Sequence, residues 1–223
     1  MIATARSPVS RPTTMWISNL KRLALASAAS LSLMGCGMAE GDQDDRNRLD
    51  YLAFSDPAFM NFCLERYDLN GDGRFSRYEA ERILSLDCSS RGIRTIDEIE
   101  VFSRLEQLNC SKNVIERLDL SRCTRLEQLN CAENALYELT LDGLRSLEEL
   151  DCHSNQLGRV DLSECGSLRW ADLRANRFTT LDCSLCSTAL QADVRVNAQL
   201  STVYYRTGQQ INFESPTTLV ERQ

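Results

Sequence analysis

The chain has 223 residues, with 25 basic and 32 acidic side chains, ten cysteines and a formal net charge of −7. Residues 1–35 contain no acid and four basic residues, so their removal would take the net charge from −7 to −11. Proteins that bind nucleic acid carry a basic stripe that neutralises phosphates. The composition therefore argues against a nucleic-acid partner.

Residues 1–35 are predicted to be a signal peptide, because basic residues precede an apolar segment too short to span a bilayer. The segment ends in Leu-Met-Gly-Cys, which resembles the lipobox at which bacterial lipoproteins are cleaved and acylated. The resemblance implies lipidation of Cys36 and a place in the cell envelope, and Gly37 after the cysteine favours the outer membrane or cell surface. Cleavage after Ala39 would instead leave a secreted or periplasmic protein, and translation from Met15 is a further alternative.

Residues 36–53 are mostly polar and charged and are predicted to form a flexible tether. Asp56-Pro57 then predicts the start of a helix. Apolar residues follow at helical spacing, and the helical pattern resumes after residue 79. Residues 54–86 are therefore expected to form a helix–loop–helix unit.

The loop of this unit, DLNGDGRFSRYE at residues 68–79, meets every constrained position of an EF-hand calcium loop. Three carboxylates and further oxygen donors suit a hard cation, and Gly73 permits the sharp turn. A solvated acidic turn without metal is the alternative. The interpretation we favour is a structural Ca²⁺ ion, whose predicted ligands are the side chains of Asp68, Asn70, Asp72, Ser76 and Glu79 and the backbone carbonyl of Arg74.

The middle of the chain repeats itself every 21 residues. LEQLNCSKN at residue 105 returns as LEQLNCAEN at 126, LEELDCHSN at 147 and LRWADLRAN at 168, with weaker copies from residues 83 and 189. A fixed period of this length indicates a solenoid, because one unit cannot bury its apolar face alone. The alternation of the apolar positions predicts one short strand per unit, and stacked units give a parallel sheet.

The shared frame, L-x-x-L-x-C-x-x-N-x-L, resembles the short bacterial form of the leucine-rich repeat family over residues 83–197. The resemblance implies an α+β solenoid that is mainly β, with parallel strands and little convex helix. It also implies that residues 54–86 are its helical N-terminal cap. Residues 198–223 are predicted to be a C-terminal cap and tail, with two short strands around Thr207-Gly208. The protein is expected to be a monomer.

The cysteines fit the repeat rather than a disulfide framework or a reactive site. Most occupy inward strand or turn positions, where cysteine behaves as a small buried hydrophobe. Cys183 and Cys186 form a C-x-x-C pair, but both belong to repeat positions, so a redox dithiol is the weaker interpretation. A disulfide between Cys165 and Cys186 stays open. His153, the only histidine, lies beside Asp151, and a nucleophile activated by it is a minor alternative.

The residues beside the inward positions form the concave face of the sheet, which is the usual binding surface of the resembled family. Its character changes in the later repeats, where tryptophan and arginine appear, and these residues often dominate interfaces. The alternative is that the aspartates keep the strand face soluble and offset the arginines beside them. The predicted contact residues are Glu149, Asp151, His153, Trp170, Asp172, Arg174, Asp193 and Arg195.

Together these features predict a non-enzymatic, lipid-anchored binding module outside the cytoplasm, with a calcium-stabilised cap. Its partner would be a protein, a peptide or a glycan. A structural envelope scaffold is the first alternative, and a hydrolase or thiol redox enzyme is a weaker one.

Overall fold

A computed structural model describes residues 50–214 and 216–222. The predicted signal peptide, the lipidation site at Cys36 and residues 36–49 of the tether lie outside this part of the chain. Among the described residues, no helix is both long enough and apolar enough to cross a bilayer.

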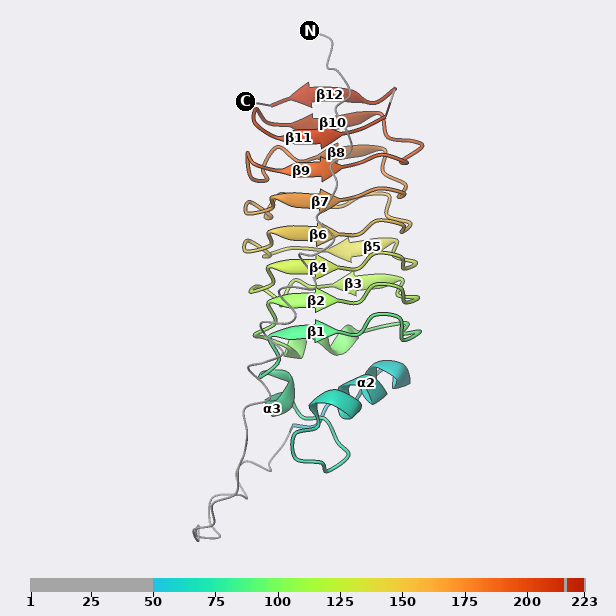
Figure 1. The fold of residues 1–223 in the computed structure, drawn as a ribbon, viewed down its shortest axis with the longest axis vertical. Coiled ribbons are helices and arrows are strands. Elements are labelled where there is room, and N and C mark those ends of the chain that lie inside the picture. The colour runs from blue at the N-terminus through green and yellow to red at the C-terminus, as the bar shows by residue number, and fades with distance from the viewer. Residues whose placement is uncertain (1–49, 215, 223) are drawn as a thin grey trace.

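The molecule is a solenoid with one main parallel sheet (Figure 1). Neighbouring strands are offset by one repeat, so that Leu108 lies beside Leu129 and Leu129 beside Leu150. Its strands, in spatial order, are β1 (Ser85–Asp87), β2 (Gln107–Asn109), β4 (Gln128–Asn130), β6 (Glu149–Asp151), β7 (Trp170–Asp172), β9 (Gln191–Asp193) and β11 (Gln210–Asn212). The predicted leucine-rich repeat architecture is confirmed.

The opposite side of the solenoid carries short extended pieces instead of helices, as 21 residues per unit leave little room for a convex helix. These pieces are β3 (Arg117–Asp119), β5 (Glu138–Thr140), β8 (Thr180–Asp182), β10 (Thr202–Tyr205) and β12 (Thr218–Glu221). They form two parallel groups, β3–β5 and β12–β10–β8. The equivalent residues 159–161 are not a strand, so this second sheet is interrupted there. The first unit instead has a short 3₁₀ helix, η1 (Asp97–Val101).

One continuous hydrophobic core runs from the cap through every repeat. The nine described cysteines are free thiols and all are buried. Their burial raises the pKa of Cys88, Cys123, Cys165 and Cys183 to about 12. Both members of the C-x-x-C pair are among the buried thiols, so neither has the exposed, low-pKa environment of a reactive cysteine.

We therefore expect these nine thiols to be inert toward a thiol reagent such as DTNB in the folded protein, and to react fully in denaturant. The measurement uses a Cys36→Ser background, and Leu185→Cys, at a position 54% exposed, provides a reactive control. A native thiol that reacts as fast as this control would contradict the buried arrangement.

The turns after β2, β4, β6, β7 and β9 are each closed by an asparagine of the repeat frame. Asn155 is typical: its Nδ2 donates to the carbonyls of Cys131 and Cys152, each at 3.0 Å, and its Oδ1 accepts from Leu136 N at 3.0 Å. Asn113, Asn134, Asn176 and Asn197 make equivalent bonds. These side chains satisfy backbone groups that turns inside a stack cannot expose to water.

The N-terminal cap contains α2 (Pro57–Tyr67) and the single-turn α3 (Arg77–Ala80). Phe59, Phe62 and Phe75 are buried between the cap and the first repeat, where Phe102 contacts Phe59 and Phe75. The helix start at Asp56 is confirmed, whereas the second helix is shorter than the pattern suggested.

The predicted tether, residues 36–53, extends too far toward the cap. Residues 50–53, assigned to the tether, include Tyr51, which forms an antiparallel bridge with Ser76 of the predicted calcium loop.

The C-terminal segment continues the solenoid. The two strands expected around Thr207-Gly208 are present, but they do not pair with each other: β11 pairs with β9, and β10 lies between β8 and β12. β12 falls in residues assigned to the tail. Gln209, in the turn that leads into β11, donates from Nε2 to the carbonyls of Cys183 at 2.8 Å and Ser187 at 3.0 Å.

Candidate functional site

On the face of the main sheet predicted to be concave, each strand ends in a polar residue, and from β1 to β9 this residue also shapes the turn that follows. Asn130 Oδ1 accepts from Ala132 N at 3.1 Å, and Asp172 Oδ1 accepts from Arg174 N at 3.2 Å. Such bonds to a backbone N–H two residues ahead are typical Asx turns. The column predicted as solvent-facing thus has a structural role in every repeat.

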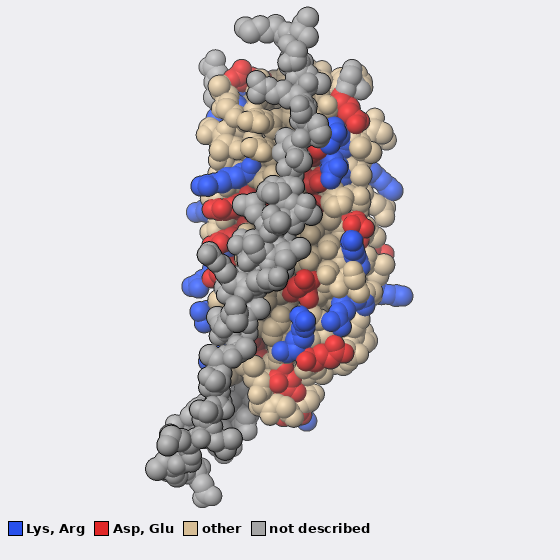
Figure 2. Space-filling model, in the orientation of Figure 1, with Lys and Arg blue, Asp and Glu red and all other residues tan. Residues whose placement is uncertain are grey.

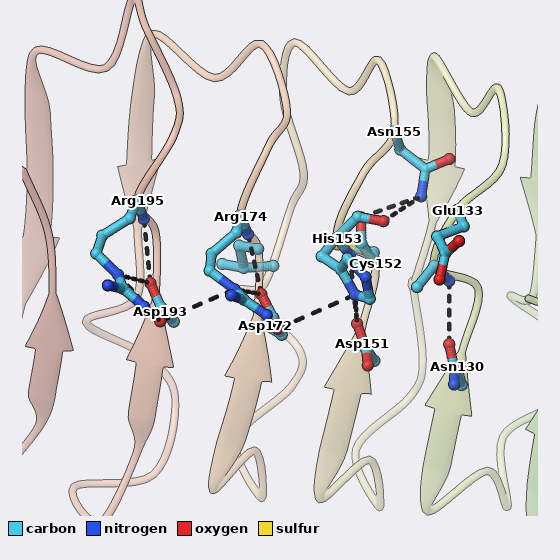
Figure 3. A network of polar contacts seen from close by, with 12 residues as sticks. Asn130, Glu133, Asp151, Cys152, His153, Asn155, Asp172, Arg174, Asp193 and Arg195 are labelled. Atoms are coloured by element: carbon cyan, nitrogen blue, oxygen red, sulfur yellow. Dashed lines mark hydrogen bonds and ion pairs between the residues drawn. The ribbon is translucent and has the colours of Figure 1, made fainter. Parts of the chain in front are cut away.

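In the later repeats, these residues join into a line of alternating charge across β6, β7 and β9 (Figure 3). We call it the polar ladder; its members are Asp151, His153, Asp172, Arg174, Asp193 and Arg195. His153 Nδ1 lies 2.6 Å from Asp151 Oδ1 and 4.0 Å from Asp172 Oδ2.

The arginines complete the ladder. Arg174 donates two hydrogen bonds to the Asp172 carboxylate, from Nε to Oδ1 at 2.8 Å and from Nη2 to Oδ2 at 2.5 Å. Its Nε also lies 3.9 Å from Asp193 Oδ2. Arg195 donates to the Asp193 carboxylate through the same two atoms, Nε and Nη2.

The structure thus brings six of the eight predicted contact residues into one network. The other two, Glu149 and Trp170, are cross-strand neighbours on β6 and β7, and both are half-buried. Each arginine is engaged by the aspartate two positions before it, and Asp151, Asp172 and Asp193 are buried, so the charge of the ladder is largely compensated within it. The sequence showed the columns but not these pairs, because residue types alone do not say which way a long side chain folds.

The hydrogen bond to Asp151 raises the pKa of His153, opposed by its partial burial. Asp151 and Asp172 add favourable charge and Arg174 lowers the pKa. A raised native pKa means that the protonated ring stabilises the fold. This stabilisation is fully present below the unfolded pKa of about 6.5 and is lost as pH rises through the native value.

We therefore expect His153→Gln to lower the free energy of unfolding more at pH 5.5 than at pH 8. Urea unfolding of parent and variant at both pH values measures the difference, and groups common to both proteins cancel. NMR titration of the ring should give a pKa above 6.5, and Asp151→Asn should lower it. A ring that titrates at or below 6.5 would contradict the ladder geometry.

In the described part of the chain we compare two candidate places for a metal ion. Among the described residues, Asp151, His153 and Asp172 bring three possible ligand atoms within 4.8 Å of one another. The Asp172 carboxylate is already held by the guanidinium of Arg174, which would face any cation placed there. The ladder therefore fits a proton on His153 better than a divalent ion.

The loop at residues 68–79 has the donor chemistry of a hard-cation site, although the oxygens of its three carboxylates, Asp68, Asp72 and Glu79, do not all lie within 4.8 Å of one another. Asp68 accepts from Gly71 N at 2.8 Å and Gly73 N at 3.0 Å, so the backbone wraps around the first predicted ligand. Both glycines have positive φ, +70° and +75°. Glu79 Oε1 accepts from Leu69 N at 2.8 Å, which closes the loop between its two ends.

Three of the other predicted ligands, Asn70, Asp72 and Ser76, also form hydrogen bonds within the loop. Asp72 N donates to Asn70 Oδ1 at 3.1 Å, and Ser76 N donates to Glu79 Oε2 at 2.8 Å as part of a capping box for α3. The donor set is all oxygen and includes three carboxylates, which is the chemistry that Ca²⁺ prefers.

No protein-family model and no curated protein matches the chain. The solved structures that it resembles include the functional domain of InlJ from Listeria monocytogenes, described as including a cysteine ladder. That likeness has 24% identity and a TM-score of 0.61, over 76% of this chain and 46% of the other. The internalin InlF from the same species matches at 19% identity and a TM-score of 0.54, over 75% of this chain and 55% of the other.

The likeness to internalins defines the fold as a leucine-rich repeat solenoid. The chain spans about half the length of these two structures. This chain also has an inward column of cysteines in consecutive units, formed by Cys88, Cys110, Cys131 and Cys152.

Proposed function

We propose that this protein is a non-enzymatic binding module that holds a protein partner against the concave sheet. The observation that supports this best is the seven-stranded main sheet, whose later strands bring Trp170 and Glu149 beside the polar ladder. A rigid parallel sheet fixes these groups in place before binding, which limits the entropy lost on association. Peptide and glycan partners are the narrower alternatives.

Beside the grey atoms in Figure 2, the visible part of this face carries basic and acidic side chains interspersed. A partner with mixed polar and aromatic groups suits such a surface better than a polyanion does.

Capture of partners from envelope extract tests the proposal, with the mature chain as bait. The bait variant Trp170→Ala with Arg174→Ala should lose at least tenfold of the captured partner, because aromatic and arginine anchors carry most interface energy. The matched control is Tyr137→Ala with Arg117→Ala, which removes an aromatic–arginine pair (5.2 Å from guanidinium to ring) from the opposite side. If the Trp170/Arg174 variant captures as much partner as the control variant does, binding at the concave sheet is refuted and the scaffold alternative is favoured.

The proposed location is the bacterial cell envelope, with the chain anchored through lipidated Cys36. Its support is the lipobox-like sequence alone. In the source bacterium, Cys36→Ser should move the protein from the detergent phase to the aqueous phase of a Triton X-114 partition. An unchanged partition would refute the anchor and leave the secreted alternative.

We also propose that the cap binds one structural Ca²⁺ ion through the residue 68–79 loop, with a Kd of about 10⁻⁴ to 10⁻³ M, as in other extracellular modules. Calcium should raise the melting temperature of the parent relative to a chelator. Glu79→Gln should abolish that rise. Its single amide oxygen can keep the capping-box bond from Ser76 N but not the bond from Leu69 N as well, so the melting temperature in chelator should also fall. No calcium response in the parent would refute the site.

A further inference from the structure

Residues 50–52 lie along one side of the predicted calcium loop. Tyr51 pairs with Ser76 in an antiparallel bridge. Leu52 N donates to Phe75 O at 2.8 Å, and Arg77 N donates to Asp50 O at 2.9 Å. We call residues 50–52 the clasp.

Side chains extend this contact to the ligands. The Tyr51 hydroxyl donates to Asp72 Oδ2 at 2.9 Å, so it touches a predicted calcium ligand directly. The guanidinium of Arg74, whose carbonyl is another predicted ligand, lies 5.0 Å from the centre of the Tyr51 ring. Arg77 and Asp50 add an exposed ion pair at 3.3 Å.

The clasp is also fixed to the cap on its other side. Phe54, two residues after the clasp, contacts the rings of Phe59 at 5.5 Å and Phe75 at 5.8 Å between centroids. Phe75 belongs to the loop and Phe59 to α2. The chain leaving the clasp is thus held by the same core that supports the loop.

We propose that the clasp is an integral part of the calcium site: Tyr51 positions the Asp72 carboxylate, and the bridge holds the ligand-bearing backbone of residues 74–76 in place. This inference rests on the proposed calcium site and adds three residues that the loop motif does not contain. Outer partners of ligating carboxylates typically change metal affinity by 10- to 100-fold when removed.

A second consequence follows from linkage. If the clasp strengthens calcium binding, calcium must strengthen the clasp by the same factor. Calcium would therefore hold the chain against the cap at residues 50–52, where the described part of the chain begins.

Calorimetric titration of the mature protein with CaCl₂ tests the affinity. Tyr51→Phe removes only the hydroxyl and should weaken calcium binding about tenfold. Leu52→Pro removes the bridge donor and should weaken it at least as much. The matched control Tyr78→Phe removes the hydroxyl of another loop tyrosine, whose ring lies 4.4 Å from the Arg82 guanidinium, and should leave the affinity unchanged.

Hydrogen exchange supplies the independent readout: calcium should slow exchange at the amides of Leu52 and Arg77 in the parent, and less so in Tyr51→Phe. Parent-like affinity in Tyr51→Phe together with calcium-independent exchange at both amides would overturn the clasp while leaving the calcium site intact. A parent that does not bind calcium would overturn both proposals. Tyr51→Phe serves where Leu52→Pro fails to fold.

Discussion

Asn155→Ala should lower the free energy of unfolding by about 3–5 kcal/mol, because it strands several buried backbone groups at once. The Asn155 amide donates to the carbonyls of Cys131 and Cys152, and its oxygen accepts from Leu136 N. The side chain is 8% exposed, so water cannot easily replace these bonds. Urea unfolding followed by circular dichroism measures the change.

Asn130→Ala is the matched control, since it makes the same chemical change in the neighbouring strand of the same sheet. Asn130 Oδ1 accepts one bond, from Ala132 N, at a half-buried position. We expect a loss of about 1 kcal/mol there. If the two variants lose similar free energy of unfolding, the frame asparagines do not have a special role in stabilising the stacked repeats.

The contrast between these two asparagines also shows what the sequence could predict. The repeat places every residue in a column with its own copies, so the inward position of Leu108 and Cys110 and the bonding role of Asn113 follow from the period alone. The main sheet, its register and the burial of the thiols could be predicted for this reason.

Features that depend on contacts outside the period could not be predicted. Tyr51 reaches Asp72 from 21 residues earlier in a segment without repeat signal, and its polar surroundings suggested a tether. Gln209 bonds the Cys183 carbonyl across the turn between β10 and β11, in a unit whose sequence has lost the frame. The polar ladder required knowing that Arg174 bends back onto Asp172. The sequence named these residue types but not their partners.

Asp56 provides the second large effect, because one buried carboxylate joins the cap to the first repeat. Its Oδ1 accepts from Ala58 N at 2.7 Å and Phe59 N at 3.1 Å at the start of α2. Its Oδ2 accepts from Arg94 N at 2.7 Å and Thr95 N at 3.4 Å in the first repeat. Burial would raise the pKa of this carboxyl, but the four N–H donors outweigh it and lower the pKa.

We expect Asp56→Ala to cost about 3 kcal/mol, from the lost helix cap and the unpaired N–H groups of the repeat. Asp56→Ser keeps a cap for α2 but cannot reach Arg94, so its loss should be intermediate. Because the pKa is lowered, the contribution of Asp56 is present above the unfolded value near 3.9 and is lost as pH falls through the native value. Urea unfolding at pH 7 and pH 3 measures both effects.

Cys63, buried on α2, should also gain reactivity toward DTNB in Asp56→Ala, since the cap then opens more often than the repeats. Stability loss without faster reaction of Cys63 would show that Asp56 stabilises the whole solenoid rather than the junction with its cap.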